Sequence, residues 1–93
     1  MRNMKGVLTT EHFHEMRGIP RIRFIEYFAE IGNLMEDGRF GADGWEVVIG
    51  PEDKVNFGRI FLPKVNIIFR TDDEDCYQQL LHGFRLRFLS AGG

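Results

Sequence analysis

The stretch that decides the fold is WEVVIGPEDKVNFGRIFLPKVNIIF, residues 45–69. Apart from Glu46, its first five residues, 45–49, are aromatic or β-branched, which predicts a strand. Residues 50–53 read Gly-Pro-Glu-Asp and predict a turn, because Pro51 presets the φ angle that such a turn needs.

The second half of this stretch, residues 55–69, is strongly apolar and predicts a second and a third strand. Pro63 has no N–H to donate to a ladder, so it marks an edge, a bulge or a turn between them. Successive strands joined by short turns pair antiparallel, so an antiparallel sheet is expected.

A helix is predicted before the sheet, over residues 21–31. Pro20 suits the first helical position, and Gly32-Asn33 forms a stop signal. Residues 36–44 hold three glycines and predict a loop. The apolar stripe of the helix consists of Phe24, Ile25, Phe28 and Ile31.

The N-terminal segment allows a short strand followed by a helical turn. Residues 5–9 predict an opening strand, and residues 11–16 predict the turn. Thr9 or Thr10 is positioned to cap this turn, since a threonine hydroxyl accepts a hydrogen bond from a free amide.

A second helix is expected from residue 71 onward, because Thr71 and the acidic residues 72–75 suit a helix N-terminus. Its end stays open. Either Gly83 stops it and residues 84–89 form a last strand, or the helix continues through them. Its apolar face consists of Tyr77, Leu80, Leu81 and Phe84.

Together these segments predict one α+β domain over residues 1–93, in the order β-α-β-β-β-α. The expected architecture is a two-layer sandwich, in which an antiparallel sheet carries two helices on one face. A ferredoxin-like arrangement with a last strand over 84–89 is the alternative.

The composition narrows the classes of function. The chain has 93 residues, a net charge of −2 and a single cysteine, Cys76. A lone cysteine excludes an internal disulfide framework and fits a reducing, cytoplasmic location. The near-neutral charge gives no argument for nucleic-acid binding, and no apolar run reaches the ~20 residues that a membrane span needs.

The histidines and the cysteine do not assemble a catalytic or metal site in the sequence. His12 and His14 share a face only on a strand, and no further His/Cys pair completes a tetrahedral set. We interpret them as surface histidines. Cys76 and His82 fall on different faces of the predicted helix. No catalytic residue, metal or cofactor is therefore expected.

Residues 37–44 form the most loop-like part of the chain and suggest a ligand site. Gly38 and Gly41 are spaced so that backbone amides can cradle a phosphate, and Arg39 supplies positive charge. A glycine-rich connection without a ligand is the structural alternative.

The chain ends in Gly92-Gly93, which carries a chemical hypothesis of its own. Ubiquitin-like sulfur carriers use such a slim tail, whose carboxylate is activated and then accepts sulfur or an amine. Glycines suit this task because no Cβ blocks a narrow channel. An ordinary chain end is the alternative.

One region of the chain resembles a known family over about residues 45–93. The run from Gly58 to Phe69, the acidic helix start and the run from Phe84 to Gly93 are similar to the C-terminal domain of proteins related to the molybdopterin synthase small subunit. The resemblance implies a TBP-like fold, with a curved antiparallel sheet and helices on one side. In that family a β-grasp sulfur carrier precedes the domain. We expect this chain to lack the carrier, so no family catalytic residue is transferred.

These observations predict a non-catalytic binding or regulatory module linked to molybdopterin or sulfur-carrier metabolism. A protein partner is expected, with self-association as an alternative. Two other functions remain open: a sulfur carrier or modifier acting through Gly92-Gly93, and a binder of a small ligand or nucleotide at Gly38, Arg39 and Gly41.

Overall fold

The computed structural model describes residues 8–88 of the chain, which form one sheet and two helices. In chain order the elements are β1 (Thr10–Arg17), α1 (Arg21–Ile31), β2 (Asn33–Glu36), β3 (Arg39–Ala42), β4 (Trp45–Phe57), β5 (Ile60–Thr71) and α2 (Glu74–Phe88). No helix within residues 8–88 combines the length and the apolar content that crossing a bilayer requires.

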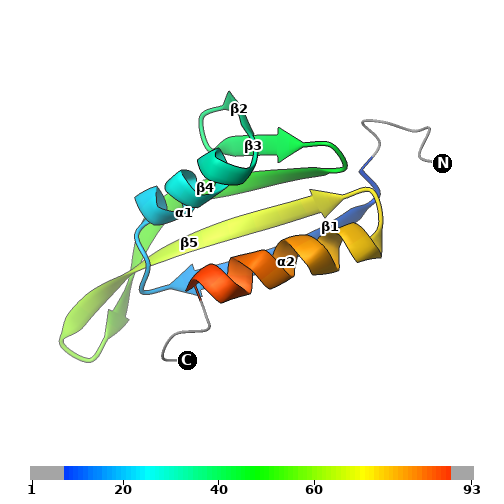
Figure 1. Cartoon of the computed structure of the whole chain (residues 1–93). Helices are drawn as coiled ribbons and strands as arrows, with labels where there is room; N and C mark the ends of the chain where they lie inside the picture. The colour runs from blue at the N-terminus through cyan, green and yellow to red at the C-terminus, as the bar shows by residue number, and fades with distance from the viewer. Residues whose placement is uncertain (1–7, 89–93) are drawn as a thin grey trace.

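The sheet has five strands in the order β1-β5-β4-β3-β2, and every neighbouring pair is antiparallel. Figure 1 shows both helices on the same side of this sheet. The predicted fold class is therefore confirmed: an α+β sandwich of two layers, with an antiparallel sheet and helices on one face. This is also the architecture that the family resemblance implies.

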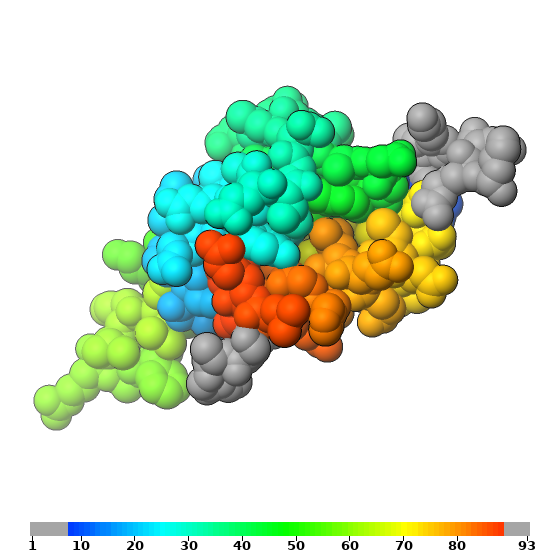
Figure 2. Space-filling model, viewed as in Figure 1, coloured from blue at the N-terminus to red at the C-terminus, as the bar shows by residue number. Residues whose placement is uncertain are grey.

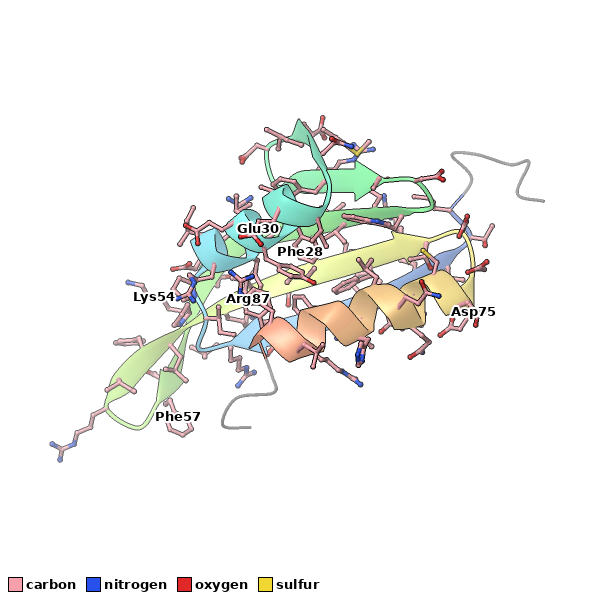
Figure 3. All side chains as sticks on the ribbon, viewed as in Figure 1. Phe28, Glu30, Lys54, Phe57, Asp75 and Arg87 are labelled. Carbon is pink, nitrogen blue, oxygen red and sulfur yellow. The ribbon has the colours of Figure 1, made fainter. Side chains whose placement is uncertain are left out.

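Aromatic rings fill the core between the helices and the sheet. Phe28 of α1 is fully buried, and its ring contacts Phe69 of β5 and Phe84 of α2 at centroid distances of 6.0 and 5.9 Å. Glu30 and Arg87 link the exposed sides of the two helices, 3.6 Å apart (Figure 3). The strands contribute Met16, Phe40, Val47, Ile49, Val65, Ile67 and Phe69 to the same core.

Strands β4 and β5 extend past the end of β1, whose last residue, Arg17, pairs with Lys64. The two-stranded ribbon beyond this point, residues 54–63, is called the arm. Figure 2 shows it projecting from one end of the body. Gly58 turns the chain at its tip with a φ of 63°, which glycine adopts without strain.

The helical turn predicted over residues 11–16 is wrong, because this segment lies inside strand β1. Its burial alternates along the strand, with His12, His14 and Met16 facing α2. The hydropathy pattern does not reveal this alternation, because two of the three inward-facing residues are histidines. Of the strand expected over residues 5–9, residues 5–7 lie outside the described part, and Leu8 and Thr9 precede β1.

The turn predicted over residues 50–53 is also wrong, whereas Pro63 lies at an edge, one of the three positions predicted for it. Residues 50–53 lie within β4 at a bulge between Ile49 and Glu52, where proline is tolerated. Pro63 pairs with Lys54 inside β5, just beyond the end of β1, so its missing N–H faces no neighbouring strand.

The loop predicted over residues 36–44 is replaced by the short hairpin of β2 and β3. The alternative strand over 84–89 is excluded for the described residues, because α2 runs through Gly83 to Phe88. Gly83 is not a stop here. It lets α2 approach Tyr27, whose hydroxyl would lie 3.0 Å from an added Cβ.

Candidate functional site

A pocket of about 500 Å³ opens where β2, β3 and the β3–β4 turn meet. It contains two of the three residues that the sequence proposed for ligand binding, Arg39 and Gly41. Its full lining is Leu8, Asn33, Met35, Arg39, Gly41, Ala42, Asp43, Gly44, Trp45 and Glu46.

Gly41 forms one wall of the pocket because it lacks a side chain. A Cβ at this position would lie 2.8 Å from the Met35 sulfur and 3.1 Å from the Trp45 carbonyl oxygen. An alanine here would therefore push the Met35 side chain aside and crowd the backbone of β4.

Gly38 lies away from the pocket, at the β2–β3 turn. Its φ is 76°, and an added Cβ would meet the Arg21 guanidinium and lie 2.8 Å from the Ile49 carbonyl oxygen. Arg21 in turn donates hydrogen bonds to the carbonyls of Ile49 and Gly50. The two glycines thus stand at opposite ends of β3 and do not form one cradle.

Arg39 belongs to a ladder of alternating charges that crosses all five strands on the face opposite the helices. In strand order its members are Glu11, Arg70, Glu46, Arg39 and Glu36. Arg70 Nε lies 2.8 Å from Glu11 Oε2, and its Nη1 lies 3.8 Å from Glu46 Oε2. Arg39 bonds Glu46 through Nε, and its Nη1 lies 3.1 Å from Glu36 Oε2.

These contacts determine which charge a ligand can reach. Hydrogen bonds that Arg39 donates to the side chains of Glu46 and then Glu36 raise the pKa of Arg39, so it stays positive at any physiological pH. The Glu46 side chain is only 10% exposed, whereas that of Glu36 is 66% exposed. An incoming anion therefore competes with Glu36, while Glu46 holds the guanidinium in place.

His12 and His14 are half-buried between β1 and α2, so the interpretation as surface histidines is wrong. The His12 ring stacks on Tyr77 with centroids 3.6 Å apart, and its Nε2 lies 3.3 Å from Glu74 Oε1. His14 Nε2 lies 2.8 Å from the Tyr77 hydroxyl. Burial, followed by the charge of Arg85, lowers the pKa of His14.

The cysteine and the third histidine lie in different surroundings on α2. Cys76 is half-buried near the N-terminus of α2, with Sγ 3.5 Å from the Gly44 carbonyl oxygen, while His82 is exposed. Within residues 8–88 no three His, Cys, Asp or Glu side chains are grouped so that they could hold a metal ion. Gly92 and Gly93 lie outside the described residues.

The charge ladder is the feature that sequence reasoning missed. Its residues come from five segments, and only the strand register brings them into one row. The signal in the sequence was limited to charged residues at outward positions of apolar strands, such as Glu46 and Arg70.

No curated protein matches the sequence. A scan against protein-family models matches the family described as archaeal MoaD-like protein over residues 12–93. The match includes β1 and α1, and so extends well beyond residues 45–93, which carry the resemblance in the sequence. The chain belongs to the archaeal MoaD-like protein family.

Proposed function

We propose that this chain is a non-catalytic binding module that serves molybdopterin or sulfur-carrier metabolism through a protein partner. Membership of the MoaD-like family supports the metabolic setting. The single cysteine supports action in the cytoplasm.

The pocket beside Arg39 is the observation that carries this proposal. Its wall offers the Met35 thioether, which lies against Gly41, and Arg39 lines the same pocket. Apolar walls with a few fixed polar groups are typical of binding sites. The matching ligand has an anionic group for Arg39 and an apolar group for Met35. A small heterocyclic anion and the carboxylate end of a partner chain both have this chemistry.

The charges around the pocket support binding rather than catalysis. General acid–base catalysis needs a group whose pKa lies near the working pH. Arg39 is fixed in its charged form by two carboxylates, and Glu46 is held between two arginines. Arg39 therefore orients a ligand more readily than it exchanges a proton.

A ligand screen followed by titration tests the proposal. Nucleotides, pterins and a purified sulfur-carrier protein are screened by thermal shift, and each hit is titrated by calorimetry. A ligand at 100 times its Kd stabilises the fold by about 2.7 kcal/mol, a shift of about 10 °C or more for a domain of this size.

Two ladder arginines provide a matched pair of variants. Arg39→Gln is expected to weaken binding about tenfold or more, because only Arg39 lines the pocket. Arg70→Gln also removes a contact to Glu46 but lies outside the pocket, so it should leave the Kd nearly unchanged. Equal losses in the two variants, or a screen without a hit, would contradict the proposal.

A second candidate is a sulfur carrier or modifier that acts through Gly92-Gly93. The family match extends to residue 93 and so includes both glycines. Among residues 8–88 one strand, β1, precedes α1, which argues against it because a β-grasp begins with a hairpin. The intact mass of the untagged chain from its own host tests this candidate. Replacement of one oxygen by sulfur at Gly93 would support a sulfur carrier. A free carboxylate in every preparation would oppose it.

A further inference from the structure

Strand β1 is the last strand on one side of the sheet, and among residues 8–88 it pairs with β5 alone (Figure 1). Just after it, the N–H of Gly18 donates to the Pro63 carbonyl oxygen at 2.9 Å. Hydrogen-bonded pairs alternate with non-bonded pairs along an antiparallel ladder, so the even-numbered residues of β1 bond to β5. The N–H and C=O groups of the odd-numbered residues therefore point away from the sheet; these residues are Glu11, Phe13, Glu15 and Arg17.

The two edges of the sheet differ in how readily another strand can pair with them. Natural edge strands are often blunted by shortness, a proline or a bulge. At the other edge, β2 has four residues and a bulge between Leu34 and Glu36. Strand β1 has eight residues in an unbroken register and contains neither proline nor glycine. It is therefore the edge that can add a strand along its whole length.

We propose that β1 pairs antiparallel with β1 of a second copy, which joins the two sheets edge to edge around a two-fold axis at His14. In this register Glu11 lies opposite Arg17 of the second copy, and Phe13 lies opposite Glu15. The pairing is self-complementary, as a two-fold interface requires. This inference goes beyond the proposed function and does not depend on it.

Charge selects this register over its neighbours. Side chains alternate along a strand, so only shifts by two residues keep the helices of both copies on one side of the joined sheet. A shift by two in one direction places Glu11 opposite Glu15, and a shift in the other direction places Glu15 opposite itself. Like charges directly opposite each other destabilise a strand pair, whereas opposite charges stabilise it. The register centred on His14 avoids both clashes and uses all four outward-pointing residues.

The charge ladder continues across this junction. Within one copy the ladder ends at the sheet edge with a negative member, Glu11, which is held by Arg70. The residue that the second copy places beside Glu11 is Arg17, so the alternation of sign is preserved. Arg17 Nε lies 2.6 Å from Glu15 Oε2, and both side chains are exposed. Such an exposed pair contributes little, so Arg17 can turn to Glu11 of the second copy at small cost.

The helix layer is compatible with the same arrangement. Helix α2 packs over β1, where His14 Nε2 lies 2.8 Å from the Tyr77 hydroxyl. Each His14 keeps this partner at the two-fold axis. The two α2 helices then run antiparallel on the same side of the joined sheet. Each helix has acidic residues in its first turn and basic residues in its last, so opposite charges lie on the same side of the junction.

Sedimentation equilibrium and amide exchange on the full chain test the proposal. The wild type should sediment at twice the mass of a single chain at about 100 μM. Amide exchange followed by NMR should show the N–H groups of Phe13 and Glu15 protected at this concentration. Both should exchange faster on dilution, because they are bonded only in the dimer.

Two substitutions of Phe13 separate the backbone from the side chain. Phe13→Pro removes an N–H that points away from β5, so the ladder within the copy keeps its hydrogen bonds. It should raise the dimer Kd about 30-fold or more, since each copy loses a donor and the ring blocks the approach of the second strand. Phe13→Ala is the matched control. It keeps the N–H and should change the Kd less than about fivefold.

Arg17→Glu carries the same test without altering the backbone. It places two like-charge pairs in the junction and should raise the Kd about tenfold. Arg59→Glu makes the same charge change on the exposed arm and should leave the Kd within about twofold of the wild type. Circular dichroism should show an unchanged fold in both variants.

Several results would overturn the proposal. One is a wild-type monomer at about 100 μM, including one whose β1 pairs with a segment of a different protein. Another is a dimer in which the Phe13 amide stays unprotected. A dimer that tolerates Phe13→Pro and Arg17→Glu would also refute it, as would one that Phe13→Ala or Arg59→Glu disrupts equally.

Discussion

Replacement of Glu46 by Gln tests whether the charge ladder stabilises the sheet. Glu46 is 8% exposed, and its Oε2 is shared by Arg39 and Arg70. Glutamine keeps the size and one acceptor oxygen but removes the negative charge between the two guanidinium groups. A hydrogen bond to a charged group contributes about 1.5–3 kcal/mol.

Exposure of the two arginines to solvent reduces the expected loss of unfolding free energy. The side chains of Arg39 and Arg70 are 38% and 37% exposed, so water compensates part of the lost interaction. We therefore expect Glu46→Gln to lower the free energy of unfolding by about 1–2 kcal/mol. For a domain of this size, that lowers the Tm by about 5–15 °C.

Urea unfolding followed by circular dichroism and by the fluorescence of Trp45 measures the change. The control is Glu15→Gln on the same face, where Glu15 pairs with Arg17 at 2.6 Å in an exposed position. That variant should stay within about 0.5 kcal/mol of the wild type. A Glu46→Gln loss no larger than that of Glu15→Gln would refute the stabilising role of the ladder.

Three further predictions concern the core and its pH response. Gly32→Ala places a Cβ 2.6 Å from the Trp45 indole, so urea unfolding should show a loss of about 1–3 kcal/mol; wild-type stability would mean that the indole moves freely. Phe28→Ala empties the centre of the core and should cost about 3–5 kcal/mol in the same assay, and a loss under 1 kcal/mol would contradict its central packing. The pKa of His14 is lowered in the folded state, so the unfolded chain binds the proton more readily and stability falls as the pH drops through about 6.5. His14→Gln should reduce the stability lost between pH 7.5 and 5, and an unchanged pH dependence would count against a buried neutral His14.

The helices were well predicted from the sequence because their signals are local. The prediction of α1 over residues 21–31 is confirmed, since an apolar stripe, a preceding proline and a glycine stop all agree there. The start of α2 carries acidic residues that suit a helix N-terminus. It continues past Gly83, where glycine allows close approach to Tyr27, a residue distant in the sequence.

The candidate site was found in part. Arg39 and Gly41 line one pocket, but Gly38 faces Arg21 at the other end of β3. The sequence gives only the number of residues between two glycines. Whether their backbone amides point at one phosphate depends on the conformation of the residues between them. Once residues 39–42 pair as a strand, the two glycines separate.

By itself the sequence determined the α+β class, the antiparallel sheet, both helices and the apolar strands, because propensity and periodicity act over a few residues. Only the tertiary structure decided that residues 10–17 form an edge strand, that Pro51 and Pro63 lie within long strands, and that five charged residues meet in one row. Each of these depends on register. Register is set when the strands bury one face under the helices, and a shift by a single residue would turn every side chain to the opposite side.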